Sequence, residues 1–326
     1  MSMHVFANIV TPYGTASNNR GESEGHITTL QKLVWMGQPH TTISAEAIRF
    51  ALRRLLASDA DPTNRTYNET TRVNEWADGT FAQAAEGKGF IDDDLLGYMS
   101  ADAAKEEVDK EETEEAEPLK KGKKGKKDKK PKGTITVRRG VLEITRAVSL
   151  TPWTGDVTFN AASPNATRSA QKQGVNPAPY GAEFHATRYQ YGLSLTPERL
   201  QNRSRAATAL AALSRLNTVA GNHSRFLYDF SPDSVVLRIS HDPAPRLLYC
   251  FRTDDHGVSV DAPALLERVT MGDIDANELI LGGPFARTPT GQALRERGAF
   301  VSSDNGVLAA FAEAIRRVDA GLQPKG

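Results

Sequence analysis

The segment His40-Thr41-Thr42-Ile43-Ser44-Ala45-Glu46-Ala47-Ile48-Arg49 leads from a polar stretch into the helix around which the fold is expected to be built. Ser44 is a favourable N-cap, because its hydroxyl can accept a hydrogen bond from a free backbone N–H of the first turn. Apolar residues then recur at three- and four-residue spacing, which predicts a helix from 45 to about 57 with one buried face. These residues are Ala45, Ile48, Ala51, Leu52, Leu55 and Leu56.

Basic and hydrogen-bonding side chains surround the start of this helix. Arg49 and Arg53 are four residues apart and therefore share a helix face. The Gly-rich segment before it adds candidate phosphate ligands, and backbone at the start of a helix binds phosphate at low energetic cost. The candidates are Asn19, Arg20, Gly21, His40, Thr42 and Ser44. The pattern predicts a surface for an extended polyanion, with a surface helix carrying solvated arginines as the alternative.

A second candidate loop follows a predicted helix. Gly221 suits a helix C-terminal stop, and hydrogen-bonding residues come directly after it: Asn222, His223, Ser224 and Arg225. Such a loop can contact phosphate and ribose without reading the base sequence. A tight turn with a locally bonded His223 is the alternative.

Several stretches resemble the DevR-like CRISPR-associated backbone subunits. They are Asn18-Asn19-Arg20-Gly21-Glu22, Ile27 to Lys32, His40 to Arg49, Ser149-Leu150-Thr151-Pro152-Trp153-Thr154-Gly155-Asp156, His185 to Gly192, and Val219 to Phe226. The resemblance covers most of the chain. Many relatives have Ser-Ser-Gln where this chain has Ser44-Ala45-Glu46, and Glu46 would repel a phosphate.

The resemblance implies a modified RRM palm with inserted fingers and a thumb, without catalytic residues. In that family the chain would polymerise along a guide CRISPR RNA (crRNA) in a type I, I-B-like surveillance complex, or Cascade, that recognises DNA. The implied partners are crRNA, the target DNA strand, copies of the same chain and other Cascade subunits. In the family, the loop corresponding to 221–225 approaches the RNA.

The expected order of elements is typical of an α+β, ferredoxin-like domain spanning 1–326. We expect strands at 3–11, 90–99, 135–149 and 185–195, a helix from Thr196-Pro197 that continues from Ala206 to Leu216, a hairpin of 235–239 with 246–251, and a final helix at 308–318. Residues 59–88 are expected to form an inserted, partly helical finger region.

A long Gly-, Pro-, Asn- and Ser-rich segment, 151–183, lies between two expected strands and is interpreted as a thumb hairpin. Its aromatic residues Trp153, Phe159 and Tyr180 can pack on an RNA base or on a neighbouring subunit. By resemblance, the thumb folds over the guide and displaces a base. Anchoring of the loop itself is the alternative.

The chain carries 40 basic and 40 acidic residues, but the two signs are segregated. Residues 102–117 are acidic and residues 120–132 are Lys-rich, which predicts a flexible insertion at 100–133. Its halves can neutralise each other, or the lysines can bind nucleic acid. A scaffold protein that binds other proteins through this insertion is a further hypothesis.

Other chemistry has weaker support. The sequence has no eighteen-residue apolar run and no secretory leader pattern, so we expect a cytoplasmic protein. The histidines are scattered and the single Cys250 is expected in a buried strand, so the sequence favours neither a metal nor a cofactor. Asp92-Asp93-Asp94 is interpreted as a solvated strand entry. The rival activity is an RRM-type endoribonuclease using His40 or His223 as general base, or, in a metal-dependent form, Asp156.

Overall fold

The computed structural model describes residues 2–17, 23–58, 60–100, 136–161, 179–219, 227–254 and 256–323. A mixed sheet forms its centre, with strand order β20-β19-β16-β1-β15-β12-β6-β5 and with β11 also pairing to β15. These strands are β1 (His4–Val10), β5 (Lys32–Trp35), β6 (Gln38–Ile43), β11 (Leu142–Ile144), β12 (Ala147–Ser149), β15 (Tyr189–Leu195), β16 (Ser234–Ser240), β19 (Leu279–Gly282) and β20 (Phe300–Val301).

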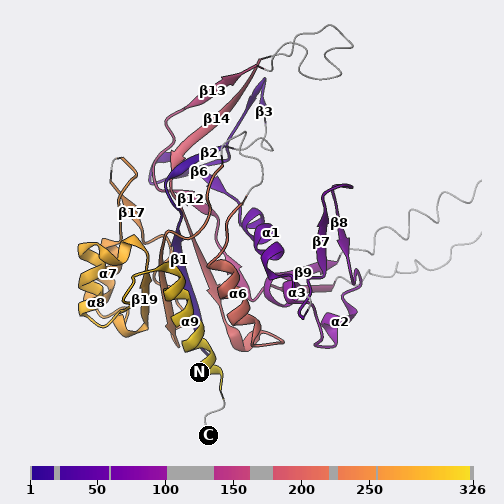
Figure 1. The fold of residues 1–326 in the computed structure, drawn as a ribbon, viewed down its shortest axis with the longest axis vertical. Helices are drawn as coiled ribbons and strands as arrows, with labels where there is room; N and C mark the ends of the chain where they lie inside the picture. Colours follow the sequence, from indigo (N-terminus) through magenta and orange to yellow (C-terminus); the bar gives the residue numbers. More distant parts are fainter. Residues whose placement is uncertain are drawn as a thin grey trace, which may run out of the picture.

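Both faces of the central sheet are covered (Figure 1). The side chains of β1 alternate between two cores: Val5 lies in one and Phe6 in the other. The first core is packed under α1 (Ala45–Leu56), α6 (Arg205–Leu213) and α9 (Val307–Leu322). The second lies under α7 (Pro263–Thr270) and α8 (Pro289–Glu296), together with the short helices η3 (Ala276–Glu278) and η4 (Pro284–Arg287).

A smaller sheet rises above the central one, at the top of Figure 1. Its order is β13-β14-β4-β3, and β2 also pairs with β14. The strands are β2 (Gly14–Ser17), β3 (Ser23–Glu24), β4 (Ile27–Thr28), β13 (Val157–Asn160) and β14 (Tyr180–Thr187). Because β14 is followed after one residue by β15, this projection is joined directly to the central sheet.

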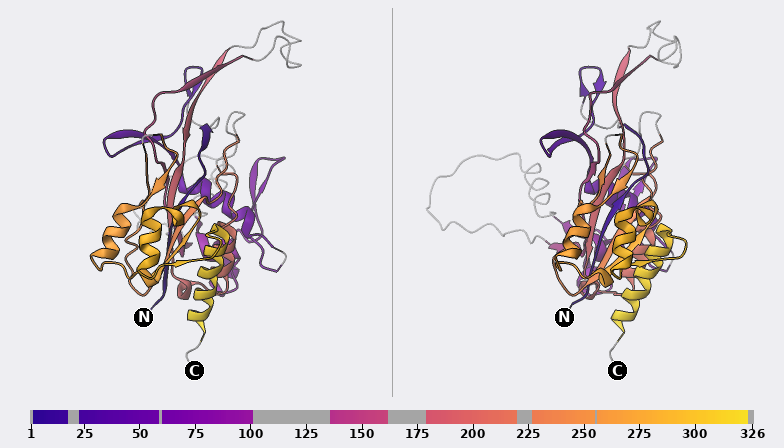
Figure 2. Two further views of the ribbon diagram at one scale, coloured as in Figure 1. Left: turned by 60° about the vertical axis from the view of Figure 1, so that its left-hand side comes forward. Right: turned by 90° about the vertical axis from the view of Figure 1, so that its left-hand side faces the viewer.

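A third region lies beside α1. It contains β7 (Arg65–Asn68), β8 (Val73–Trp76), α2 (Ala82–Ala85), α3 (Ile91–Leu96), β9 (Gly97–Ser100) and β10 (Thr136–Arg139). The left view of Figure 2 shows the β7–β8 hairpin and the α7–α8 region on opposite sides of the central sheet. The remaining short elements are η2 (Pro197–Arg199), β17 (Arg252–Thr253) and β18 (Val260–Asp261).

The α+β class is confirmed, and so is the capped helix. Ser44 Oγ accepts a hydrogen bond from Ala47 N at 3.2 Å, and α1 ends one residue before the expected boundary. The strands expected at 3–11 and 235–239 and the final helix are also present. The segment expected as one strand at 185–195 is instead two strands, β14 and β15, separated by Arg188.

Other expectations from the sequence are wrong. Residues 91–96 form a helix rather than a strand, because Ile91 and Leu95 pack on one side into the core. The Asp92-Asp93-Asp94 run in this helix is buried rather than solvated. Residues 246–251 form a loop, since Arg246 and Tyr249 have φ of 56° and 55°, which a strand does not adopt. Cys250 lies in this loop and is buried, as expected, although not in a strand.

Candidate nucleic-acid interface

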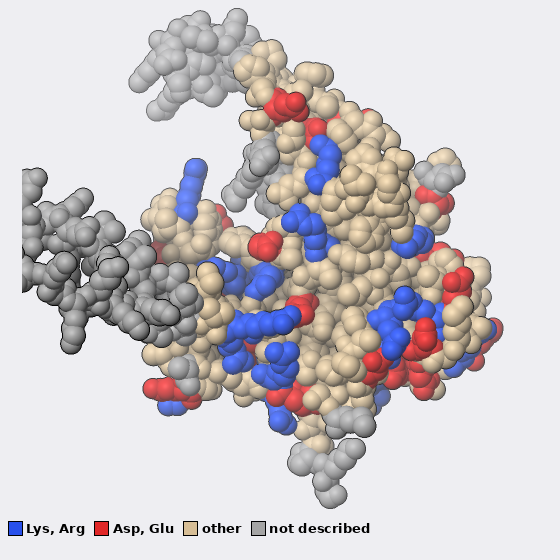
Figure 3. Space-filling view, turned by 180° about the vertical axis from the view of Figure 1, so that it is seen from behind, with Lys and Arg blue, Asp and Glu red and all other residues tan. Residues whose placement is uncertain are grey.

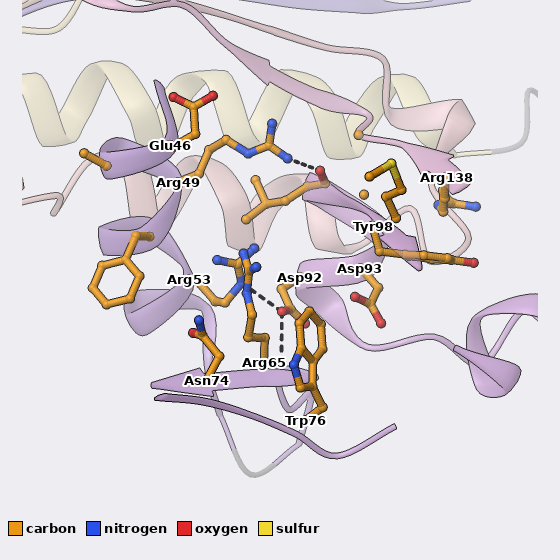
Figure 4. A pocket seen from close by; sticks show the side chains of 16 residues that line it. Glu46, Arg49, Arg53, Arg65, Asn74, Trp76, Asp92, Asp93, Tyr98 and Arg138 are labelled. Carbon is orange, nitrogen blue, oxygen red and sulfur yellow. Dashed lines mark hydrogen bonds and ion pairs between the residues drawn. The ribbon is translucent and has the colours of Figure 1, made fainter. Parts of the chain in front are cut away.

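A cleft of about 800 Å³ lies between α1, α3, the β7–β8 hairpin and the β9–β10 pair, and is called the α1 cleft below (Figure 4). Its lining combines arginines, carboxylates and large apolar side chains: Glu46, Ala47, Arg49, Phe50, Arg53, Arg65, Asn74, Trp76, Asp92, Asp93, Leu96, Gly97, Tyr98, Met99, Arg138 and Gly140.

The floor of the α1 cleft is a buried ion pair. Arg53 Nε lies 2.9 Å from Asp92 Oδ2, and both side chains are almost fully buried. Asp92 also accepts hydrogen bonds from the backbone N–H groups of Asn64 at 2.7 Å and Arg65 at 3.3 Å. Arg53 is therefore buried rather than on the surface, and its charge is largely balanced by Asp92, because the first residue of the Asp run points toward α1. Its contact with phosphate stays a prediction.

Two further arginines of the α1 cleft are not balanced in this way. Arg49 donates to the Leu96 carbonyl, and the Arg65 guanidinium lies 5.2 Å from the centre of the Trp76 ring. Neither forms an ion pair with any carboxylate in the described part of the chain. Burial, followed by repulsion from Arg53, lowers the pKa of both guanidiniums. Clustered cations of this kind favour an anionic ligand.

The remaining carboxylates of α3 tie this region to the rest of the protein. Asp93 Oδ2 accepts from Asn64 Nδ2 at 2.8 Å, and burial, followed by repulsion from Asp92, raises the pKa of Asp93 to about 6. Asp94 accepts from Arg138 at 2.6 Å and Arg205 at 3.0 Å. Three adjacent residues thus fix α1, the β7–β8 region, β10 and α6.

A glycine closes the junction between α3 and β9. Gly97 has φ of 72°, and a Cβ there would lie 2.3 Å from the backbone oxygen of Arg138. Only glycine tolerates both the left-handed backbone and this close approach. It therefore allows β9 and β10 to pair closely where they form one wall of the α1 cleft.

The face seen from behind in Figure 3 is rich in basic side chains. Lys and Arg gather across its middle and continue toward the projecting sheet, while many of its acidic side chains lie along the lower edge. Lys32, in β5, is neutralised locally: its Nζ is paired with Glu183 at 2.5 Å and lies 3.9 Å from the centre of the Trp153 ring.

The residues expected before the helix are largely internal. His40 is 5% exposed, and its Nδ1 lies 2.7 Å from the Ser149 carbonyl oxygen. Thr42 is also buried, and its hydroxyl accepts from Arg146 Nη1 at 3.1 Å. The Ser44 hydroxyl is engaged in capping α1. Strand β6 directs His40 and Thr42 inward, and their contact with phosphate stays a prediction.

Two groups of predicted site residues lie outside the described residues: Asn19, Arg20 and Gly21, and the loop Gly221, Asn222, His223, Ser224 and Arg225. Of the expected thumb residues, Trp153 is an anchor, since its Nε1 donates to the Phe184 carbonyl at 3.2 Å. Phe159 and Tyr180 are exposed on β13 and β14.

Arg65, Trp76 and Arg138 line the α1 cleft but were not predicted from the sequence. Arg65 and Trp76 are opposite one another in the β7–β8 pairing, within a segment whose polar composition concealed two strands. An arginine at the start of one short strand and a tryptophan at the end of the next are placed to meet across a hairpin, and this is the signal that could have identified them.

No known protein-family model matches the chain. The chain is 53% identical, over 324 residues, to the CRISPR-associated protein Cas7/Cst2/DevR of Myxococcus xanthus (strain DK1622). The match covers 98% of this chain and 99% of that protein. The chain belongs to the Cas7/Cst2/DevR family.

Solved structures similar in fold to this Cas7/Cst2/DevR family member come from CRISPR RNA-guided surveillance complexes. A chain of a complex described as pre-nicking has a TM-score of 0.55 at 12% identity, with coverage of 97% of this chain and 100% of that one. A chain of a second complex has a TM-score of 0.50 at 17% identity, with coverage of 95% and 99%. At these identities the similarity concerns the fold.

Two observations bear on other sites. Among the helices described here, none has both the length and the apolar content needed to cross a bilayer. Within the same described ranges, no three His, Cys, Asp or Glu side chains are grouped so as to hold a metal ion.

Proposed function

We propose that this chain is a non-catalytic backbone subunit of a type I CRISPR surveillance complex. It holds guide crRNA through contacts with phosphate and ribose that do not depend on base sequence, and so supports recognition of a target DNA strand. Its other partners are copies of itself along the guide and the remaining Cascade subunits. Family membership and the similarity in fold to chains of surveillance complexes support this assignment.

The central part of the fold is the proposed RRM-type palm. Along the chain, β1, α1, β12, β15, α6 and β16 follow the βαββαβ order of ferredoxin-like domains. In the sheet these strands lie in the order β16-β1-β15-β12, with α1 and α6 on the same core. We assign 59–88 as the fingers, 100–133 as a charged insertion and 151–183 as the thumb, whose Phe159 and Tyr180 are available to contact RNA or a neighbouring copy.

The single observation that carries the proposal is the pair Arg49 and Arg65, which face the α1 cleft without a carboxylate partner among the described residues. Phosphate oxygens are strong acceptors for guanidinium groups and require no particular base. His40, Thr42 and Ser44 support the helix start from within the fold. Asn19 to Gly21 and Gly221 to Arg225 remain proposed RNA contacts on the basis of the family resemblance.

Catalysis by His40 has little support, because a general base must reach the proton that it abstracts and this ring is buried against Ser149. Incubation of the purified chain with its precursor RNA in a chelator tests the point. Specific cleavage that His40→Ala or His223→Ala abolishes would contradict the non-catalytic assignment.

The main test is to purify the full chain from cells that produce its crRNA and to sequence the co-purifying nucleic acid. Short RNAs with a shared repeat-derived end are expected. Arg49→Glu and Arg65→Glu should each reduce the amount of bound RNA, whereas Arg54→Glu, on the exposed face of the same helix, should retain it. Equal RNA recovery from all three variants would overturn the assignment of the α1 cleft.

A further inference from the structure

The α1 cleft has an apolar side that phosphate binding does not require. Phe50, Trp76 and Met99 line it and remain 37%, 44% and 69% exposed. Soluble proteins seldom leave several large apolar side chains exposed together unless the surface binds something. The volume of about 800 Å³ is also within the range of pockets that hold small organic groups, roughly 300–1,000 Å³.

Trp76 is held in place from within the finger region. The Phe81 ring meets it edge-on with centroids 5.5 Å apart, and Phe81 in turn stacks on Tyr98 at 4.1 Å. Phe81 is itself buried. The indole is thus braced by the protein, with the Arg65 guanidinium over one face at 5.2 Å from the ring centre, while Trp76 remains 44% exposed (Figure 4). A fixed, accessible aromatic ring beside a guanidinium is a favourable platform for a nucleobase.

The carboxylates in the α1 cleft also favour a nucleobase over a phosphate as its ligand. Glu46 and Asp93 would repel a phosphate placed deep in the cleft, because like charges oppose each other more strongly in a partly buried site. A carboxylate oxygen can instead accept a hydrogen bond from the exocyclic amino group of a base. The amide of Asn74, on β8, adds a donor and an acceptor to the same lining.

We infer that the α1 cleft receives an unstacked nucleobase of the bound single strand. The base packs against Trp76, while Arg49 and Arg65 hold the flanking phosphates. This inference rests on the proposed function. The finger region then contributes base-stacking energy without reading sequence, since every base has a π-face. This role is separate from that of the thumb aromatics, which belong to the projecting sheet.

Binding of two strands by the full chain tests the inference. One is an oligouridylate, and the other is a ribose-phosphate strand of the same length without bases. Wild-type protein should bind the oligouridylate about 5- to 150-fold more tightly, as stacking of one base predicts. Trp76→Ala should remove most of this difference and leave affinity for the abasic strand unchanged, while Trp76→Phe should retain most of it. Val73→Ala removes an exposed apolar side chain from the same strand, outside the cleft lining, and should change neither affinity.

The alternative outcomes separate the inference from the proposed function. Equal binding of both strands by wild-type protein would overturn the inference and leave RNA binding through phosphates standing. So would an undiminished difference in Trp76→Ala, which would assign the stacking to another aromatic residue. Equal weakening of both strands by Trp76→Ala would reduce Trp76 to a structural role. Failure of wild-type protein to bind either strand would overturn the proposed function as well.

Discussion

Arg53 Nε of α1 and Asp92 Oδ2 of α3 lie 2.9 Å apart, and this buried ion pair forms the floor of the α1 cleft. The arginine that the sequence marks as a phosphate ligand is therefore committed to a structural contact. Its neighbours in the α1 cleft, Arg49 and Arg65, have no carboxylate partners among the described residues.

Asp92→Asn should destabilise the protein strongly. The change leaves the Arg53 charge buried and weakens the acceptor for the backbone of Asn64 and Arg65. Removal of one member of a buried pair costs about 3–5 kcal/mol. Urea denaturation measures the change in unfolding free energy. Arg54→Gln is the control, because its pairing with Glu69 is exposed and should be worth less than about 1 kcal/mol. Equal effects of the two changes would contradict this account of the cleft floor.

Arg65→Gln should flatten the salt dependence of RNA binding. For every phosphate of a single strand that the protein no longer neutralises, the slope of log affinity against log salt concentration becomes shallower by about 0.7. Binding measured across a salt series gives the slope directly. Arg54→Gln should leave the slope unchanged, because Arg54 does not line the α1 cleft. A weaker affinity with an unchanged slope would mean that Arg65 acts by supporting Trp76 rather than by meeting phosphate.

Asp93→Asn should change how stability responds to acid. Burial, followed by Asp92, raises the pKa of Asp93 in the folded protein to about 6 from 3.8, so between these values the folded state holds a proton that the unfolded state has lost. In the wild type this group lowers stability as pH rises through that window, by on the order of 2–3 kcal/mol. The asparagine variant should lack this loss. Denaturation midpoints from pH 4 to about 7 test it, with the exposed Glu86→Gln as control.

His185 should act in the opposite direction over nearly the same range. Its ring is buried between Thr41 and Thr151, and burial lowers its pKa to about 4 from 6.5. As pH falls from 6.5 toward 4, the unfolded state gains a proton that the folded state does not, and stability falls by roughly 3 kcal/mol. His185→Gln should remove that fall, and the exposed His241→Gln should not. An identical pH profile for wild type and His185→Gln would show that His185 titrates normally in the folded state.

The sequence alone was sufficient to predict those helices and strands whose signals lie within a few neighbouring residues. The Ser44 cap, the apolar spacing of α1 and the largely apolar run of β1 each predict their element without reference to distant residues. The family resemblance in the sequence was likewise confirmed by a relative that is 53% identical over nearly the whole chain.

The rest depended on partners far away in the chain. Asp92-Asp93-Asp94 reads as solvated because three adjacent carboxylates are normally exposed, and only the fold brings Arg53, Arg138 and Arg205 to them. Residues 246–251 read as a strand because they are apolar, whereas their burial is achieved by a loop with left-handed residues. The α1 cleft could not be predicted for the same reason: its walls come from several elements that are separate in the sequence.

Helix α3 connects α1, β10 and α6 through ion pairs. Six residues long, it is clamped by arginines from a helix on one side and from a strand and a second helix on the other, so the anchorage of the fingers does not reside in the hairpin itself. The outer end of β7–β8 takes no part in these ion pairs, so we expect changes in its length or composition to leave the contact between α1 and α3 in place.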